Sequence, residues 1–253
     1  MAKGSLLYIT LGCAKNEVDT DRMRALLDAA DYQEVDSAQD ADAVVINTCS
    51  FLASATSESI ETTLALAEEV KEGVRAARII MCGCVPSRYG DQLPQELPEV
   101  SAFVRADEED GIVAVVDEVL GVERDMPSFI PNIKRTVEGS VAYVKISDGC
   151  DRFCSCCAIP YIRGRYHSRP ADRIIAEARE LVAGGVKEIV LIGQDTGIWG
   201  KDFKDQVDGP ANLAQLLVAL AEELRPQHVW IRVLYLQPEG MTGELIAAIR
   251  DTP

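Results

Sequence analysis

Half of the eight cysteines of this chain lie in one eight-residue segment, Cys150-Asp-Arg-Phe-Cys-Ser-Cys-Cys157. Through Cys150, Cys154 and Cys157 the segment has the spacing Cys-x3-Cys-x2-Cys. A loop of this length can fold around one iron-sulfur cube, because three thiolates bind three irons of a four-iron cluster and leave the fourth iron open to a chelating ligand. An open iron would make the site catalytic. The alternative is a zinc knuckle, in which Cys156 supplies a fourth thiolate.

Three further cysteines, Cys13, Cys49 and Cys84, each follow a short apolar run that is typical of a buried strand. Because the carboxyl ends of parallel strands lie at one edge of a sheet, we expect these thiols to converge there, where α/β folds place ligands. Three thiolates again fit a cluster with one open iron. The alternative is three unrelated buried cysteines, since free Cys is among the most buried residue types. Cys82 points to the other side of its strand, and we expect it in the core.

Other candidate residues carry weaker signals. Gln194 and Asp195 close a predicted strand, where polar groups could contact a bound cofactor, although a plain strand-to-loop turn explains them equally well. With only His167 and His228, the chain offers no His-rich metal site and no Ser-His-Asp triad. Neither a phosphate loop nor a Gly-x-Gly-x-x-Gly turn occurs.

The formal net charge of −16 opposes sequence-independent binding to phosphate backbones, so nucleic acid is not expected as the substrate. The charge suits a basic protein partner better. One basic stretch follows the dense cysteine segment, and it is either a solvated loop and helix start or a substrate-binding element. Its members are Arg163, Arg165, His167, Arg169 and Arg173.

Strand and helix patterns alternate through residues 5–120 and predict an α/β domain with a doubly wound parallel sheet. The predicted strands are residues 6–10, 43–47, 78–81 and 102–105, and the predicted helices are residues 19–30, 57–70 and 111–120. Residues 121–139 contain two prolines and little periodicity, so we assign them to a linker.

Residues 140–253 restart the alternation as three successive β-α units. The predicted strands are residues 141–146, 188–192 and 229–236, and the predicted helices are residues 171–183, 212–224 and 243–250. Three parallel units with one unfinished edge form part of a larger β/α barrel, so we predict a partial TIM-like barrel in a C-terminally truncated chain.

Composition predicts a globular cytoplasmic protein. Of the 253 residues, 47% are hydrophobic and 26% are charged, and no segment is long and apolar enough to suggest a membrane span or a secretion signal. Cysteines stay reduced in the cytosol, where clustered thiols are more often metal ligands or catalysts than disulfides.

Several short motifs together resemble the radical S-adenosylmethionine methylthiotransferases. They are Gly12-Cys-Ala-Lys-Asn16, Asn47-Thr-Cys-Ser-Phe51, Gly83-Cys84, and the cysteine loop followed by Ala158-Ile-Pro160 and Arg163-Gly164. The resemblance runs from about Leu6 to Arg250. Four further segments are similar in sequence to the branch that modifies ribosomal protein uS12: Val18-Asp19, Ser57-Ile60, Gln194-Thr196 and Trp230-Tyr235. The alternative branch modifies isopentenyladenosine in tRNA.

The resemblance implies a fold, two 4Fe-4S clusters and S-adenosylmethionine. Residues 5–120 would be the methylthiotransferase N-terminal domain, with an auxiliary cluster on Cys13, Cys49 and Cys84. Residues 140–253 would be an incomplete radical SAM core, whose cluster on Cys150, Cys154 and Cys157 cleaves S-adenosylmethionine. The family's C-terminal TRAM domain is absent from this sequence, and Cys156 stands where the family usually has an aromatic residue.

The implied reaction is methylthiolation of the β-carbon of an aspartate in uS12. S-adenosylmethionine would serve as both radical source and methyl donor, and a cluster-bound sulfur would be transferred. Implied partners are uS12 and an electron donor such as flavodoxin or ferredoxin, with no membrane. Gln194 and Asp195 are the expected contacts to S-adenosylmethionine.

Overall fold

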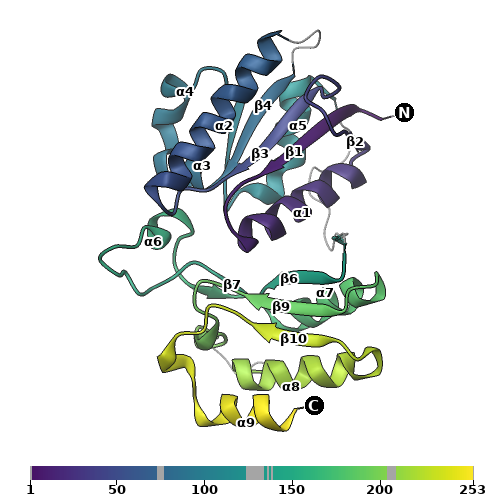
Figure 1. Ribbon diagram of the computed structural model, residues 1–253, viewed down its shortest axis with the longest axis vertical. Coiled ribbons are helices and arrows are strands. Elements are labelled where there is room, and N and C mark those ends of the chain that lie inside the picture. The colour runs from purple at the N-terminus through teal and green to yellow at the C-terminus, as the bar shows by residue number, and fades with distance from the viewer. Residues whose placement is uncertain are drawn as a thin grey trace. The chain divides into compact units, whose positions relative to one another are not determined.

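Two groups of parallel strands organise the chain (Figure 1). The computed structural model describes residues 2–72, 77–123, 134–135, 137, 139–203 and 209–252. Unit 1 comprises Met1–Arg135 with Tyr161–Arg163, and unit 2 comprises Thr136–Pro160 with Gly164–Pro253. Most of the predicted linker, residues 121–139, lies outside the described residues.

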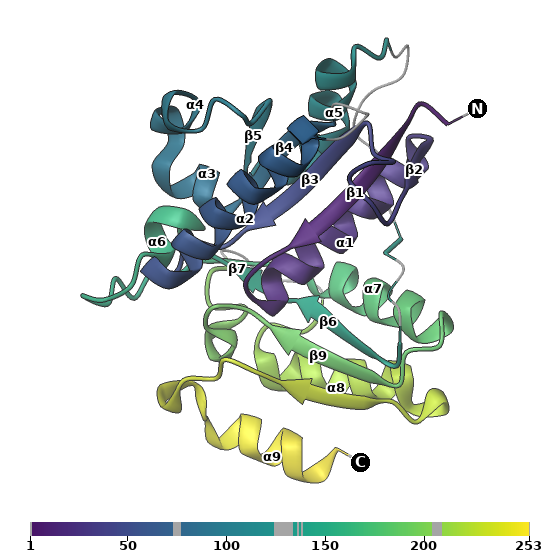
Figure 2. The ribbon, with the colours of Figure 1, turned by 45° about the horizontal axis from the view of Figure 1, so that its top comes forward.

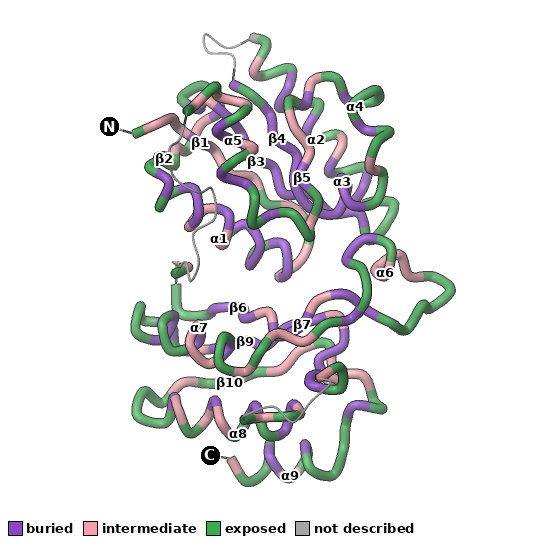
Figure 3. The backbone as a smooth tube through the Cα atoms, turned by 180° about the vertical axis from the view of Figure 1, so that it is seen from behind, coloured by how far each residue is buried: buried purple, intermediate pink, exposed green. Residues whose placement is uncertain are grey.

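Unit 1 contains a five-stranded sheet in the order β2-β1-β3-β4-β5, with every neighbouring pair parallel. The two central strands, β3 and β4, are almost fully buried because helices cover both faces (Figure 3). The strand bounds are β1 Gly4–Thr10, β2 Tyr32–Glu34, β3 Ala43–Thr48, β4 Arg78–Gly83 and β5 Ala102–Arg105.

The helices of unit 1 pack on the two faces of this sheet. On one face, Leu26 and Ile112 belong to a core that also contains Ile80 and Cys82. On the other face, Leu66 packs in a second core. The helices of the first face are α1 Ala14–Ala29 and α5 Ile112–Leu120, and those of the second are α2 Ala53–Glu72, α3 Cys84–Tyr89 and α4 Leu93–Glu96. The doubly wound arrangement and the core position of Cys82 are therefore confirmed.

The strand order of unit 1 reverses between β1 and β3. The chain adds β2 on one side of β1, and then returns to add β3, β4 and β5 on the other side. In open α/β sheets, ligands bind outside the carboxyl ends of the strands at such a switch point. Cys13 and Cys49 follow the two strands that flank this point.

Unit 2 contains a three-stranded parallel sheet in the order β10-β9-β6 (Figure 2). Its helices share one apolar core with the sheet, in which Ile174, Ile189, Leu216 and Leu245 are buried. Successive strands that lie side by side, each followed by a helix, are the repeat of a β/α barrel. The bounds are β6 Val141–Lys145, α7 Ala171–Ala183, β9 Glu188–Ile192, α8 Leu213–Leu224, β10 Trp230–Val233 and α9 Gly243–Asp251. The predicted partial barrel is thus confirmed.

Several short elements escaped prediction because they are too brief to show periodicity. They are β2, α3, α4, α6 Ile159–Ile162, and the antiparallel pair β7 Ser147–Asp148 and β8 His167–Ser168. Short 3-10 turns occur at η1 Gly90–Gln92, η2 Glu109–Gly111, η3 Thr196–Ile198, η4 Arg225–Gln227 and η5 Pro238–Gly240.

Several predicted boundaries were wrong, among them the start of α2 at Ala53 instead of residue 57, and two have identifiable reasons. The first helix begins at Ala14 instead of residue 19, because its first turn is polar and its buried side chains Lys15 and Asn16 give no apolar repeat. The last strand ends at Val233 instead of residue 236, and Tyr235 adopts a left-handed φ of 60° that an extended strand does not accommodate.

No helix in the described part of the chain combines the length and the apolar content that a bilayer crossing requires.

We expect Ile174→Ala to lower the free energy of unfolding of unit 2 by about 2–5 kcal/mol, because the side chain is fully buried in α7. The matched control Ile246→Ala removes the same atoms from α9, where the residue is 49% exposed, and should change stability by less than about 0.5 kcal/mol. The chain's two tryptophans, Trp199 and Trp230, both lie in unit 2, so urea unfolding followed by tryptophan fluorescence reports this unit. Equal losses in the two variants would contradict the assigned core.

Candidate functional site

Cys13, Cys49 and Cys84 lie at the carboxyl ends of β1, β3 and β4. Cys13 is the N-cap residue of α1, Cys49 directly follows β3, and Cys84 opens α3. The thiols of Cys49 and Cys84 are hydrogen-bonded to each other. A Cβ on Gly12 would lie 2.5 Å from the Cβ of Cys49, so the backbone next to Cys13 passes directly against that residue. Three cysteines separated by more than thirty residues in sequence are therefore close neighbours in unit 1.

Buried polar side chains hold the backbone of this edge in place. Asn16 Nδ2 donates to the carbonyl oxygens of Leu11, at 2.8 Å, and Thr48, at 2.9 Å. The Ser59 hydroxyl on α2 binds both backbone groups of Cys49: it accepts from the N–H at 3.1 Å and donates to the carbonyl at 3.0 Å. The cysteine positions are consequently fixed by hydrogen bonds as well as by the strands. Asn16 and Ser59 stood within the family motifs, but the spacing of the cysteines gave no role for them.

The Cys49 and Cys84 thiols differ in how readily they ionise. The hydrogen bond from the Cys84 thiol lowers the pKa of Cys49 to about 6, against the opposing effect of burial. The hydrogen bond to Cys49, together with burial, raises the pKa of Cys84 well above its ordinary value. The pair therefore releases its first proton easily. Because the thiolate is the form of cysteine that ligates metal, the lowered pKa favours Cys49 as a ligand.

The second cysteine group occupies a loop of unit 2 whose base is closed by backbone contacts. Cys150 N donates to Gly164 O at 3.2 Å, and Cys157 N donates to Cys154 O at 3.0 Å, which forms a turn. Gly149 has a φ of 71°, and a Cβ there would lie 2.1 Å from the carbonyl oxygen of Arg165, so only glycine fits. Cys150 is buried, Cys157 is half-buried, and Cys154 and Cys156 are exposed.

The thiol groups can be tested against the ligand sets that the sequence suggested. Among the described residues, no three His, Cys, Asp or Glu side chains surround one point as the ligands of a single metal ion would. A four-iron cube makes a different demand, since each thiolate binds a different iron and the sulfurs stand around a larger body. Three neighbouring thiols with one readily formed thiolate suit that donor chemistry.

Polar atoms without partners mark a further site at the carboxyl edge of the unit 2 sheet. Asp195 is fully buried; its Oδ2 accepts from Arg152 Nε at 2.6 Å, but its Oδ1 has no hydrogen-bond partner among the described residues. The Gln194 Oε1 is likewise buried without a partner in the described chain. An unpaired buried acceptor costs about 1–3 kcal/mol, so two on adjacent residues indicate that a polar ligand completes them. These atoms fit the amino and hydroxyl donors of S-adenosylmethionine.

The basic stretch that follows the cysteine loop does not act as one element. Arg165 and Arg173 have exposed side chains beside Asp151 and Asp172, and His167 is exposed too. Arg163 differs, because its side chain is only 3% exposed and forms an ion pair with Asp19 within unit 1. Neither a solvated loop nor a substrate surface describes a buried arginine. Nothing in the charge pattern distinguished it from its neighbours.

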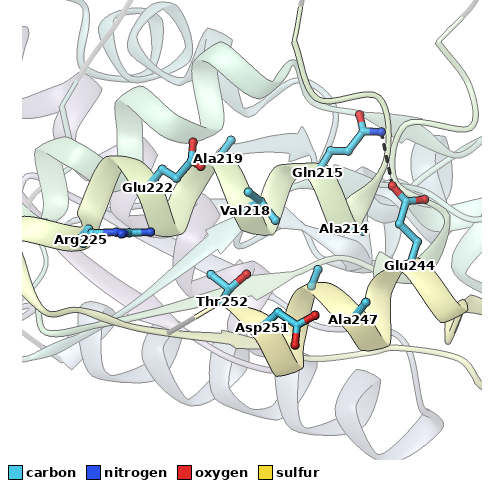
Figure 4. A pocket seen from close by; sticks show the side chains of 11 residues that line it. Ala214, Gln215, Val218, Ala219, Glu222, Arg225, Glu244, Ala247, Asp251 and Thr252 are labelled. Atoms are coloured by element: carbon cyan, nitrogen blue, oxygen red, sulfur yellow. Dashed lines mark hydrogen bonds between the residues drawn. The ribbon is translucent and has the colours of Figure 1, made fainter.

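A groove of about 640 Å³ lies between α8 and α9 (Figure 4). Alanines and Val218 line its floor, and Glu222, Arg225 and Glu244 stand at its sides. The groove lies on the helical layer of unit 2 and includes none of the predicted site residues.

Two family profiles match the chain. The profile of the "uncharacterized protein family UPF0004" covers residues 5–105, and that of the Radical SAM superfamily covers residues 144–252. Among curated proteins, the "ribosomal protein uS12 methylthiotransferase RimO" of Synechococcus sp. is 40% identical over 262 aligned residues, which span 100% of this chain and 53% of that protein. The chain is thus similar over its whole length to uS12 methylthiotransferases, and residues 144–252 match the Radical SAM superfamily.

Other similar methylthiotransferases of the same name come from Gloeobacter violaceus and Geotalea uraniireducens. The first is 42% identical and aligns with 96% of this chain and 54% of its own length; the second is 40% identical, with 98% and 56%. The chain thus spans about half the length of the curated methylthiotransferases that it matches.

Solved structures support the fold. The radical S-adenosylmethionine methyltransferase TsrM from Kitasatospora setae, determined with cobalamin and a 4Fe-4S cluster, has a TM-score of 0.66 at 13% identity and covers 98% of this chain and 59% of its own. The cobalamin-dependent radical enzyme OxsB has a TM-score of 0.55 at 11% identity and covers 98% and 41%. At these identities the likeness concerns architecture alone.

We expect Gly83→Ala to disrupt the carboxyl edge of the unit 1 sheet. Gly83 has φ 90° and ψ −137°, and an added Cβ would lie 2.2 Å from Asn47 Oδ1 and 2.8 Å from the Thr48 carbonyl oxygen. The control Gly90→Ala has φ 51° and ψ −125° with open space around the Cβ, so it carries backbone strain of about 1–3 kcal/mol without a collision. Urea unfolding followed by far-ultraviolet circular dichroism should show the larger loss for Gly83→Ala. Equal losses of stability in the two variants would mean that the short contacts of a Cβ at residue 83 do not affect the free energy of unfolding.

Proposed function

We propose that this chain carries the two domains of an enzyme that methylthiolates the β-carbon of an aspartate in ribosomal protein uS12. Support comes from the 40% identity to RimO proteins over the whole chain. The observation that carries the proposal is the coexistence of two three-cysteine groups, one at the switch point of a doubly wound sheet and one in a Cys-x3-Cys-x2-Cys loop on a β/α sheet.

We assign the cysteines to two clusters. Cys150, Cys154 and Cys157 would hold the 4Fe-4S cluster that binds S-adenosylmethionine, and Gly149 lets the backbone turn tightly before the first of them. The three cysteines of unit 1 would hold the auxiliary cluster. When bound, S-adenosylmethionine supplies the substrate radical and the methyl group, and the auxiliary cluster supplies the sulfur.

Gln194 and Asp195 would orient S-adenosylmethionine. Their unpartnered acceptor atoms are buried, so a cofactor donor bound there would be shielded from water. Arg152 holds the other oxygen of the Asp195 carboxylate, which fixes the direction in which Oδ1 points. Gln194 and Asp195 thus present acceptor oxygens that are in position before S-adenosylmethionine binds.

The proposed partners follow from chemistry and charge. The net charge of −16 favours a basic protein substrate over a nucleic acid. Reductive cleavage of S-adenosylmethionine needs single electrons, so we propose a small electron carrier such as flavodoxin or ferredoxin as a partner. The reaction is proposed to take place in the cytoplasm, where thiols stay reduced before the clusters are loaded.

Iron content tests the two-cluster assignment. Anaerobically reconstituted protein should hold about eight irons per chain, and replacing either cysteine group by alanine should leave about four. The iron assay is accompanied by circular dichroism, so that loss of fold is separated from loss of ligands. About four irons in the unmodified protein would remove the auxiliary cluster, and colourless protein with stoichiometric zinc would overturn the enzyme itself.

Mass spectrometry tests the substrate. In a strain that lacks the gene, uS12 should lose the mass of the methylthio group, while tRNA keeps its methylthio-isopentenyladenosine. Re-expression of the gene restores the uS12 modification. The opposite pattern, with altered tRNA and unchanged uS12, would assign the chain to the tRNA branch.

A further inference from the structure

Arg163 has an unusual position for a charged side chain. It is 3% exposed, and its guanidinium reaches three groups of unit 1: Asp19 Oδ2 at 2.6 Å, Asn16 Oδ1 at 2.8 Å and the Cys84 sulfur at 3.8 Å. The same nitrogen, Nη2, faces both Asn16 and Cys84. One end of the guanidinium is therefore bound to a carboxylate, and the other end is directed at the thiol group.

Burial of this cation needs compensation. An arginine stays protonated in proteins, and taking it out of water is costly unless opposite charge and hydrogen bonds replace the solvent. Asp19, itself only 4% exposed, supplies one negative charge. A neutral thiol would add little to this balance, whereas a cysteine sulfur that carries negative charge gives a stronger, charge-assisted contact.

The cation lies directly against a cysteine sulfur: Nη2 of Arg163 is 3.8 Å from the sulfur of Cys84, and both residues are buried. A surface arginine would exert only a weak effect, since water and salt screen it. Here the low polarity of the surroundings preserves the interaction over several ångströms.

We propose that Arg163 is the charge-compensating residue of the auxiliary cluster site, and that it raises the reduction potential of a cluster held by Cys13, Cys49 and Cys84. This inference rests on the proposed function, which places a cluster on those cysteines. Reduction adds one electron from the reductant and no proton, so the cluster gains one negative charge while Arg163 stays protonated. A fixed cation beside Cys84 stabilises the more negative, reduced form. Arg163 is in this sense a positioning residue.

The alternative is a purely structural ion pair between Arg163 and Asp19. In that case the arginine would hold the segment Tyr161–Arg163 against α1, and its removal would destabilise unit 1 without changing the electronic properties of a cluster that remains bound. A measurement of the reduction potential distinguishes the two roles, because a purely structural ion pair would not change that potential.

The test uses the 253-residue chain with Cys150, Cys154 and Cys157 replaced by alanine, so that only the auxiliary cluster is present. In this parent, Arg163→Gln removes the charge and keeps hydrogen-bonding capacity. Dithionite titration with redox mediators, followed by electron paramagnetic resonance, gives the midpoint potential, and an iron assay gives the occupancy. We expect Arg163→Gln to lower the ratio of reduced to oxidised cluster at fixed potential at least tenfold, a shift of about 59 mV for one electron.

Two further variants make the outcome decisive. Arg163→Lys keeps the charge and should stay within tenfold of the parent. Arg22→Gln removes an arginine of α1 that forms an exposed pair with Asp110 of η2, and should leave the potential unchanged. An unchanged potential in iron-loaded Arg163→Gln overturns the inference. If Arg163→Gln holds no iron, Arg163→Lys decides: a folded lysine variant that also fails to load assigns Arg163 to structure alone.

The parent separates this inference from the proposed function. About four irons per chain in the parent supports the auxiliary cluster, whatever the arginine variants show. A parent that folds but binds no iron contradicts the cluster assignment itself and, with it, the basis of the role proposed for Arg163.

Discussion

The side-chain amide of Asn16 joins the two strand ends on which the chemistry of unit 1 depends. It is fully buried and binds the carbonyls of Leu11 and Thr48, which lie at the carboxyl ends of β1 and β3. Those strands flank the point at which the sheet order reverses, so the Asn16 side chain links the two strand ends on either side of this switch point. Its oxygen accepts from Arg163, which brings the cation to the cysteines. Loss of this amide would leave several buried groups unpaired, at a cost of about 1–3 kcal/mol each.

The two cysteine groups are positioned by different structural elements. The three cysteines of unit 1 are placed by a sheet whose central strands are buried on both faces, and the buried amide and hydroxyl groups around them leave the backbone little freedom. The cysteines of unit 2 belong to a single loop, and that loop is shaped by the glycine conformation at residue 149 and by one turn. One cysteine group is thus held by a sheet edge and the other by a loop in which Cys154 and Cys156 are exposed.

The sequence predicted the features that depend on long patterns. Apolar runs located the main strands, and the rule that parallel strands end at one edge predicted that Cys13, Cys49 and Cys84 would be neighbours. The sequence could not reveal that Arg163 is buried, because the burial of one arginine among several depends on tertiary packing that charge patterns do not encode. The unpartnered acceptors of Gln194 and Asp195 likewise required coordinates, since a polar strand end reads the same whether its atoms are satisfied or not.

The sequence separation of the cysteines has a consequence for how each ligand set is assembled. The loop set spans eight residues, so its closure is local and costs little chain entropy. The set at the sheet edge is drawn from residues 13 to 84, a long-range closure that must precede any gain from binding. The hydrophobic cores of the doubly wound sheet supply that closure during folding. The three thiols at this edge therefore become neighbours only once the strands of the whole domain have paired.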